Sequence, residues 1–257
     1  MNEVQTKEQP GDAAAPNPAP GLTIVIPAHN EEQALPLCLR SIEEARPLFP
    51  GTLEIVVVLN RCSDATEEIA LHAGCRIVRC DIKNLSVIRN AGVRASRAPL
   101  VATIDADSRM SRGMLAHIAE IMKDPRTIGG GVLILPERYS LGILASALML
   151  LPIALYHGIG GGLFFFRRES FEAIGGFDER RLSAEDIDFI VRLKRHARSQ
   201  GKRIRTLLRS YIVTSCRKFD HFGDWYFVTH PLMTWRLLRG TDAEAANRVW
   251  YDFFRTK

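Results

Sequence analysis

Short apolar runs recur along the first half of the chain, each followed by polar residues and then by a stretch with helical spacing. After the first run, LTIVIPA, apolar residues stand at positions 35, 39 and 42, three or four residues apart as on one face of a helix. The runs cover residues 22–28, 53–59, 75–80 and 100–104. Strands that are apolar throughout are buried on both sides. The pattern therefore predicts an α/β fold with a mostly parallel sheet flanked by helices on both faces.

The later part of the chain continues this pattern within one large domain. With 46% hydrophobic residues, the chain has enough apolar side chains for a sizeable core. We expect a strand over 163–168, a helix over 183–198 and a final strand over 211–215. The predicted organisation is a disordered tail over 1–21, a main domain over 22–220 and a C-terminal helical extension over 221–257.

Cysteine usage and the N-terminal sequence bear on the compartment. The five cysteines form no C-x-x-C pair and are odd in number, so we interpret them as reduced thiols. The first 21 residues are rich in Ala and Pro and lack the apolar core of a secretory signal. These features predict a cytoplasmic protein.

Two segments bear on the kind of partner. Residues 189–218 hold ten Lys or Arg and no carboxylate, which suits phosphate, a lipid head group or nucleic acid, although a solvated helix face explains the same charges. Nucleic acid is disfavoured because no reader motif or aromatic platform accompanies the block. No charged residue occurs between Tyr139 and Phe166, but Pro152 interrupts the apolar run. Over 139–159 we expect a helix packed in the domain or lying at a membrane surface, in preference to a membrane span.

Two carboxylates directly follow the run that ends at Ile104. Asp105 and Asp107 are two positions apart, so in an extended segment both side chains point to one side while Ala106 points away. Two oxygen ligands at one spot suit Mg²⁺ or Mn²⁺, which complete their coordination with waters and substrate phosphates. The D-x-D pattern also occurs by chance in surface loops, so its meaning depends on the rest of the sequence.

Several short segments occur in a fixed order, each at or near the end of a predicted strand. They are IVIPAHNEE, VVLNRCSDAT, the pair Arg89-Asn90, the loop DADS, GGLFFFRRESFEAIGGFDE and AEDIDFIVRLKR. In this order the chain resembles the family 2 glycosyltransferases, over about residues 22–215. The resemblance implies the A-type nucleotide-diphosphosugar transferase fold, an inverting reaction and a nucleoside diphosphate sugar as donor.

The resemblance assigns the nucleotide pocket to the loops after the first two strands. The residues at the family's donor-binding positions in these loops are Pro27, Ala28, Asn30, Glu31 and Asn60. The family commonly has two aspartates where this chain has Leu59 and Asn60. An amide offers donors and an acceptor and leucine offers neither, so the resemblance does not determine which nucleotide base is bound. Asn30 is also of a preferred type for a helix N-cap, which is an alternative role.

The resemblance assigns the diphosphate end of the donor to charged residues. It implies that Arg89 contacts the diphosphate or orders the metal loop, and that Asp105 and Asp107 hold Mg²⁺ or Mn²⁺, with Asp105 nearer the ribose. Arg217 and Lys218 lie where a loop often closes over the donor. They hold phosphate oxygens there or belong to the basic block.

Asp186 matches the family's general base, which takes the proton of the acceptor hydroxyl. Ser183, followed by an acid three residues later, is also the pattern of a helix start, so the same segment has a structural explanation.

From the sequence we therefore expect a metal-dependent, inverting glycosyltransferase that moves a sugar to a hydroxyl acceptor. The apolar and basic segments suggest a lipid-linked or cell-envelope acceptor and a location at the inner face of the membrane. Two alternatives remain open. One is a membrane-surface binding protein of the same fold without catalysis. The other is a sugar-phosphate nucleotidyltransferase, which should carry a Gly-rich basic loop where this chain has AHNEE.

Overall fold

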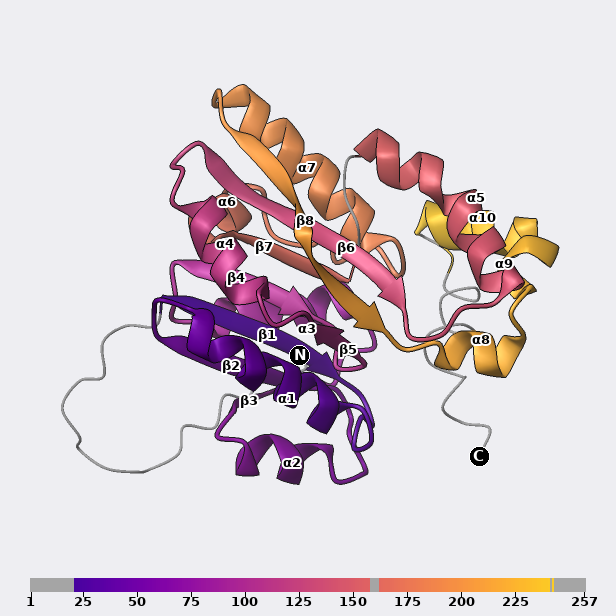
Figure 1. Cartoon of the computed structure of the whole chain (residues 1–257), viewed down its shortest axis with the longest axis horizontal. Coiled ribbons are helices and arrows are strands. Elements are labelled where there is room, and N and C mark those ends of the chain that lie inside the picture. The colour runs from indigo at the N-terminus through magenta and orange to yellow at the C-terminus, as the bar shows by residue number, and fades with distance from the viewer. Residues whose placement is uncertain (1–20, 158–161, 241, 243–257) are drawn as a thin grey trace.

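The structure is a computed structural model that describes residues 21–157, 162–240 and 242. In this part of the chain a single eight-stranded sheet has helices on both faces, and a group of helices follows the last strand (Figure 1). The predicted tail, apart from Gly21, and residues 241 and 243–257 of the predicted C-terminal extension lie outside the described residues.

Strands and helices alternate in the first half of the chain, as predicted. The elements are β1 (Leu22–Ala28), α1 (Leu35–Ala45), a 3₁₀ helix η1 (Arg46–Leu48), β2 (Leu53–Leu59), α2 (Thr66–His72), β3 (Arg76–Arg79), α3 (Leu85–Ala95), β4 (Leu100–Ile104), β5 (Ser108–Met110) and α4 (Met114–Met122). The four predicted strands of this half are confirmed.

The second half carries the longer strands. Its elements are β6 (Thr127–Pro136), α5 (Leu141–His157), β7 (Leu163–Arg167), α6 (Arg168–Ala173), α7 (Glu185–Ser199), β8 (Arg203–Thr214), α8 (Arg217–Phe222), α9 (Tyr226–Thr229) and α10 (Pro231–Arg239). The strand at 163–168 and the helix at 183–198 are confirmed to within two residues. The last strand begins at Arg203 and not at residue 211, and the predicted domain boundary at 220 falls inside α8.

The strand order explains which loops meet. The order is β3-β2-β1-β4-β7-β6-β8-β5, and the pairs among the first four strands in this order are all parallel. β7 joins β4 in antiparallel orientation, and β6 and β8 then pair in parallel. The mostly parallel sheet is therefore confirmed. Parallel strands end at the same edge, so the loops after β1, β2 and β4 lie together.

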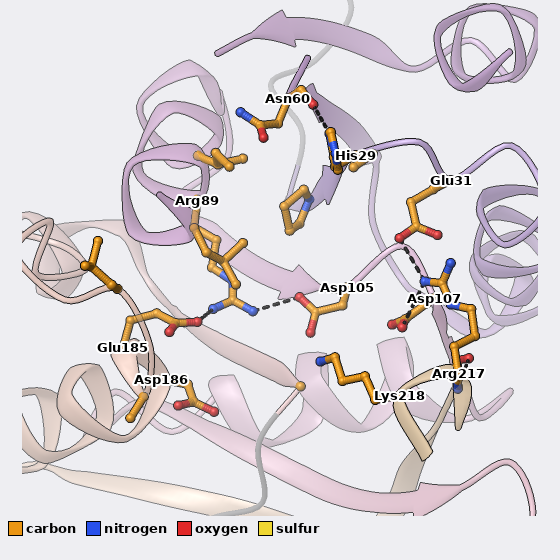
Figure 2. A pocket seen from close by; sticks show the side chains of 18 residues that line it. His29, Glu31, Asn60, Arg89, Asp105, Asp107, Glu185, Asp186, Arg217 and Lys218 are labelled. Atoms are coloured by element: carbon orange, nitrogen blue, oxygen red, sulfur yellow. Dashed lines mark hydrogen bonds and ion pairs between the residues drawn. The ribbon is translucent and has the colours of Figure 1, made fainter. Parts of the chain in front are cut away.

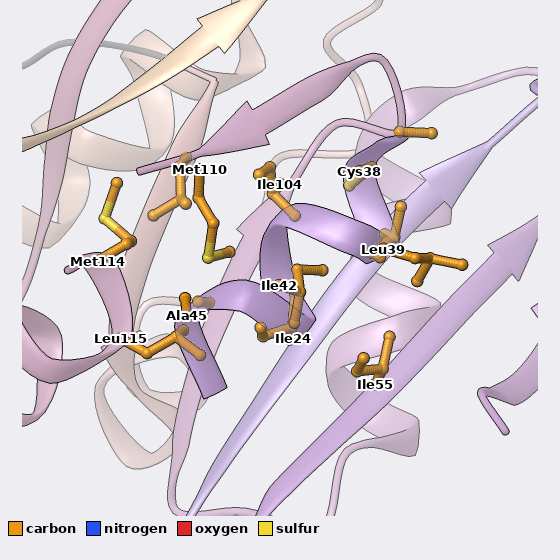
Figure 3. Packing of buried hydrophobic residues seen from close by; sticks show 14 of the residues in the cluster. Ile24, Cys38, Leu39, Ile42, Ala45, Ile55, Ile104, Met110, Met114 and Leu115 are labelled. Carbon is orange, nitrogen blue, oxygen red and sulfur yellow. The ribbon is translucent and has the colours of Figure 1, made fainter. Parts of the chain in front are cut away.

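Alternate residues of the central strands fill two cores on opposite faces of the sheet. Ile24 and Ile26 of β1 belong to a cluster with α1 and α4, and Figure 3 shows part of this packing around Ile42. Val25, between them, belongs to the second cluster, which contains residues of α3 and α7 such as Phe189. This alternation is the two-residue period of a strand, with each face covered by helices.

No strand is predicted from the sequence over β6, whose sequence contains three successive glycines, a residue that weakens strands. The structure shows why glycine is used. A Cβ atom on Gly130 would lie 1.7 Å from the carbonyl oxygen of Arg205, and one on Gly129 would lie 2.6 Å from that of Phe165. The glycines therefore allow β6 to approach both of its neighbours closely.

α5 occupies most of the apolar segment 139–159 and packs against α9. None of the helices in the described residues has the length and hydropathy needed to cross a bilayer. All five cysteines are free thiols, in agreement with the sequence-based interpretation.

Candidate active site

A cavity of about 230 Å³ lies where the loops after β1, β2 and β4 meet the starts of α7 and α8. Figure 2 shows its charged side chains facing one another across this space. The predicted site residues that line it are Pro27, Ala28, Glu31, Asn60, Arg89, Asp105, Asp107 and Asp186. The structure thus brings together residues that are up to 159 positions apart in the chain (from 27 to 186).

Asn30 is the one predicted site residue that does not line this cavity. Its backbone has a positive φ of 53°, and its side-chain oxygen accepts a hydrogen bond from the backbone N–H of Ser63 at 2.8 Å. The alternative role of Asn30 as a helix cap is wrong, because α1 begins after Ala34 and has no side-chain cap. Asn30 instead ties the loop after β1 to the loop after β2.

Asn60 is almost fully buried at the wall of the cavity. Its amide nitrogen donates to the backbone oxygens of Cys80, at 2.6 Å, and Ile82, at 2.9 Å. Its side-chain oxygen is buried and has no hydrogen-bond partner in the described residues. Because both amide hydrogens are used by the backbone, Asn60 offers a ligand only an acceptor. The neighbouring Leu59 is packed in the core and does not line the cavity.

His29 also lines the cavity and was not predicted as a site residue. Its Nδ1 donates to the backbone oxygen of Asn60 at 2.6 Å, which fixes the ring beside the second loop. The available signal was its position directly after the first apolar run, next to residues that the resemblance did assign.

Asp105 and Asp107 both line the cavity, whereas Ala106 between them is buried in the core. The expectation that the two carboxylates share one side of the chain is therefore confirmed. Arg89, from α3, donates to Asp105 at 2.7 Å and to Glu185 of α7 at 2.5 Å. Its side chain is only 4% exposed. One buried arginine thus joins the acidic loop after β4 to the start of α7.

The environment of Arg89 determines its charge. Burial alone would lower the pKa of Arg89, but Asp105 and Glu185 together hold that pKa above its ordinary value. The guanidinium is therefore charged at every working pH, and it contacts the acidic loop through Asp105.

A second arginine, from α8, reaches the same carboxylates from the other side. Arg217 donates to Glu31 at 2.9 Å and to Asp107 at 3.2 Å. Burial raises the pKa of Glu31 to about 7, although the hydrogen bond and charge of Arg217 lower this pKa. Burial lowers the pKa of Lys218, which also lines the cavity, to about 8. Both residues of the Arg217-Lys218 pair therefore belong to the site.

The formal charges of the cavity are unbalanced. The carboxylates that line it are Glu31, Asp105, Asp107, Glu185 and Asp186, and the cationic side chains are Arg89, Arg217 and Lys218. The carboxylates exceed the cations by two charges when all five are ionised, and by one when Glu31 keeps its proton. In the described residues, no group of three or more His, Cys, Asp or Glu side chains forms a metal site by itself. The donor set suits a hard divalent cation that takes its remaining ligands from phosphate and water.

Asp186 lies at the first turn of α7, on the far side of the cavity from the loop after β1 (Figure 2). Burial, and then the neighbouring carboxylate of Glu185, raise the pKa of Asp186 above its ordinary value. The alternative in which Ser183 caps this helix is wrong. The helix begins after Ala184, which has a left-handed backbone, and the hydroxyl of Ser183 donates to the backbone oxygen of Leu237 at 2.7 Å.

The sheet order, the carboxylate pair after β4 and the cavity at the strand ends are those of a glycosyltransferase with the A-type fold. A solved mannosyltransferase from Pyrobaculum calidifontis, in complex with GDP-Man and Mn²⁺, superposes with a TM-score of 0.59. That comparison covers 97% of this chain and 80% of the other chain at 17% identity, so it supports the fold alone.

The chain belongs to glycosyl transferase family 2, whose model matches residues 23–175. An uncharacterized glycosyltransferase of Mycobacterium tuberculosis is 34% identical over 110 residues, which are 42% of this chain and 47% of the relative. The chain thus spans about half the length of that relative. A dolichyl-phosphate hexose transferase of Haloferax volcanii is 28% identical over 172 residues, 64% of this chain and 74% of the relative.

Proposed function

We propose that this glycosyltransferase moves a sugar from a nucleoside diphosphate sugar to a lipid-linked acceptor, with inversion at the anomeric carbon. The observation that carries the proposal is the position of Asp186, which lines the same cavity as the Asp105-Ala106-Asp107 loop but comes from a different element. An inverting transfer needs the leaving group and the incoming oxygen on opposite sides of the sugar, each beside its own protein group.

The residues present fit a divalent cation, because the carboxylates of the cavity outnumber its cationic side chains and Asp105 and Asp107 share one wall. Asp107 and Asp105 would hold Mg²⁺ or Mn²⁺. When bound, such an ion neutralises the charge that grows on a departing diphosphate. Without it, a diphosphate would enter a cavity that already has a net negative charge, which is unfavourable.

The chain's own cations have separate tasks in this proposal. Arg217 and Lys218 lie on α8 at the cavity wall and would bind phosphate oxygens of the donor. Arg89 is only 4% exposed and joins Asp105 to Glu185, so we assign it the task of holding the acidic loop against α7. Asn60 would accept a hydrogen bond from the nucleoside, since its oxygen is the unpaired atom of its amide.

Asp186 would accept the proton of an acceptor hydroxyl as its oxygen attacks the sugar. A raised pKa makes a carboxylate a better base near neutral pH, as long as it is ionised when the acceptor binds. A hydroxyl acceptor requires such a general base, because its proton must be removed as its oxygen attacks.

A phosphate group is a second candidate acceptor. Two observations favour it: the cavity has two cationic side chains, on α8, besides Arg89, and the Haloferax volcanii relative is named a dolichyl-phosphate hexose transferase. A phosphate oxygen already carries negative charge and needs no base. The two acceptors therefore predict different consequences for a variant of Asp186.

The proposal is tested by incubating the protein with a panel of sugar nucleotides, Mn²⁺ and membrane lipid extracts, and measuring release of nucleoside diphosphate. We expect release from one donor class, and loss of nearly all of it in Asp107→Ala. Asp124→Ala is the matched control, because Asp124 pairs with Arg203 outside the cavity. Donor binding without turnover would favour the binding-protein alternative. Pyrophosphate release from a nucleoside triphosphate would favour the nucleotidyltransferase.

The variant Asp186→Asn then separates the two acceptors. With a hydroxyl acceptor, loss of a general base costs about 10²- to 10⁴-fold in kcat. With a lipid phosphate, kcat should change by less than about tenfold, because no proton is removed.

A further inference from the structure

Leucines cover the outward face of α5. Leu141, Leu144, Leu148 and Leu151 are exposed and follow one another at intervals of three, four and three residues, so they lie along one face of the helix. Leu141 and Leu148 are 76% and 68% exposed. Ile143, between two of these leucines, is buried. The first half of α5 is therefore packed through the face that carries Ile143 and Ser146, and the leucine stripe is exposed.

The surface around this stripe is also apolar. Met149 and Leu150 are exposed beside it, and no Asp, Glu, Lys or Arg occurs from residue 139 to 166. Single exposed leucines are common on soluble proteins, whereas a continuous apolar patch marks a contact with a protein or a membrane.

The neighbouring helices add aromatic and basic side chains. Trp225, half exposed, is placed beside the start of α5, because a Cβ on Gly142 would lie 2.6 Å from the backbone of Asp224. On α10, Leu232, Trp235 and Arg239 are exposed at intervals of three and four residues. The guanidinium of Arg239 lies 3.7 Å from the centre of the Trp235 indole ring.

We propose that the α5 stripe, together with Trp225 and the exposed face of α10, docks the protein on an anionic lipid bilayer. The combination favours lipid over a second copy of the chain. Leucines enter the acyl region, tryptophans prefer the boundary between apolar and wet layers, and arginine binds anionic head groups. The chain also has a net charge of +5, which favours an anionic surface.

Docking at this surface brings the candidate active site close to lipid. Arg138, just before α5, donates to Asp220 of α8 at 2.6 Å and to Asp224 at 2.7 Å. α8 is the helix that places Arg217 and Lys218 in the cavity. The docked helix and the cavity wall are therefore tied together by ion pairs. The choice of lipid as occupant rests in part on the proposed lipid-linked acceptor.

The test is flotation of the full chain with vesicles of phosphatidylcholine and phosphatidylglycerol in a three-to-one ratio. The test variant is Leu144→Glu/Leu148→Glu, and the matched control is Leu208→Glu, because Leu208 is 72% exposed on β8 and outside the proposed surface. We expect wild type and control to float, and the double variant to bind at least about tenfold more weakly. Thermal unfolding checks that all three are folded.

Three results would overturn the docking proposal. The first is that the wild-type protein does not float, and the second is that the double variant floats like wild type. The third is that the wild-type protein is a dimer that does not bind vesicles, whereas the double variant is a monomer. Nucleoside diphosphate release is measured in parallel with a short-chain, water-soluble acceptor. Release without vesicle binding refutes the docking surface alone, whereas vesicle binding without release from any donor refutes the proposed function alone.

Discussion

Replacing Arg89 by methionine should destabilise the fold strongly, whereas the same change at Arg94 should not. Both arginines are on α3 and both pair with a carboxylate. The side chain of Arg89 is 4% exposed and that of Arg94 is 63% exposed. The comparison therefore isolates the effect of burial on an ion pair.

The size of each loss in the free energy of unfolding depends on how buried the carboxylates are that lose their arginine partner. Without Arg89, the buried Glu185 and the partly buried Asp105 lose their common cation, and breaking a buried pair of this kind costs about 3–5 kcal/mol. Without Arg94, Glu179 is exposed to water, and a surface pair contributes at most about 1 kcal/mol. Methionine fills part of the space that the arginine chain leaves.

Urea unfolding at pH 7 measures the two free energies of unfolding. Adding Glu185→Gln to Arg89→Met should restore on the order of 1–3 kcal/mol, because it removes the unpaired buried charge. The reasoning fails if Arg89→Met and Arg94→Met lower the free energy of unfolding by the same amount. It also fails if the second substitution restores nothing.

Three further predictions concern stability. Because the pKa of Glu31 is raised from 4.5 to about 7, the folded state keeps a proton that the unfolded chain loses between these values. The free energy of unfolding should therefore fall as pH rises from 5 to 8, by at most about 3 kcal/mol, and urea titrations at both pH values should show a smaller fall in Glu31→Gln. Gly130→Ala should lower the melting temperature by many degrees, because its Cβ would meet the carbonyl oxygen of Arg205; a melting curve like that of wild type would contradict the close packing of β6. Asn84→Ala should cost at least about 1–2 kcal/mol in urea unfolding, because the Asn84 side-chain oxygen caps the first turn of α3 and its amide donates to the backbone oxygens of Glu179 and Arg181; no loss would mean that these contacts contribute nothing.

The apolar runs specified the first four strands, since a strand buried on both faces needs apolar residues throughout. The carboxylate pair after Ile104 was equally readable, because the two-residue period of an extended segment fixes which side chains share a side. The order of the short motifs was enough to assign the family. These features are local, so neighbouring residues in the chain are sufficient to define them.

Only the tertiary structure decided how these local features combine. It placed β7 antiparallel to β4, made a strand of the glycine-rich residues in β6, and joined Arg89 to Glu185 across 96 positions. It also brought Arg217 to Asp107, and it showed that Asn30 links two loops and does not cap a helix. Such contacts depend on the packing of elements distant in sequence, where burial and charge pairing choose the partner. Local periodicity carries no information about that choice.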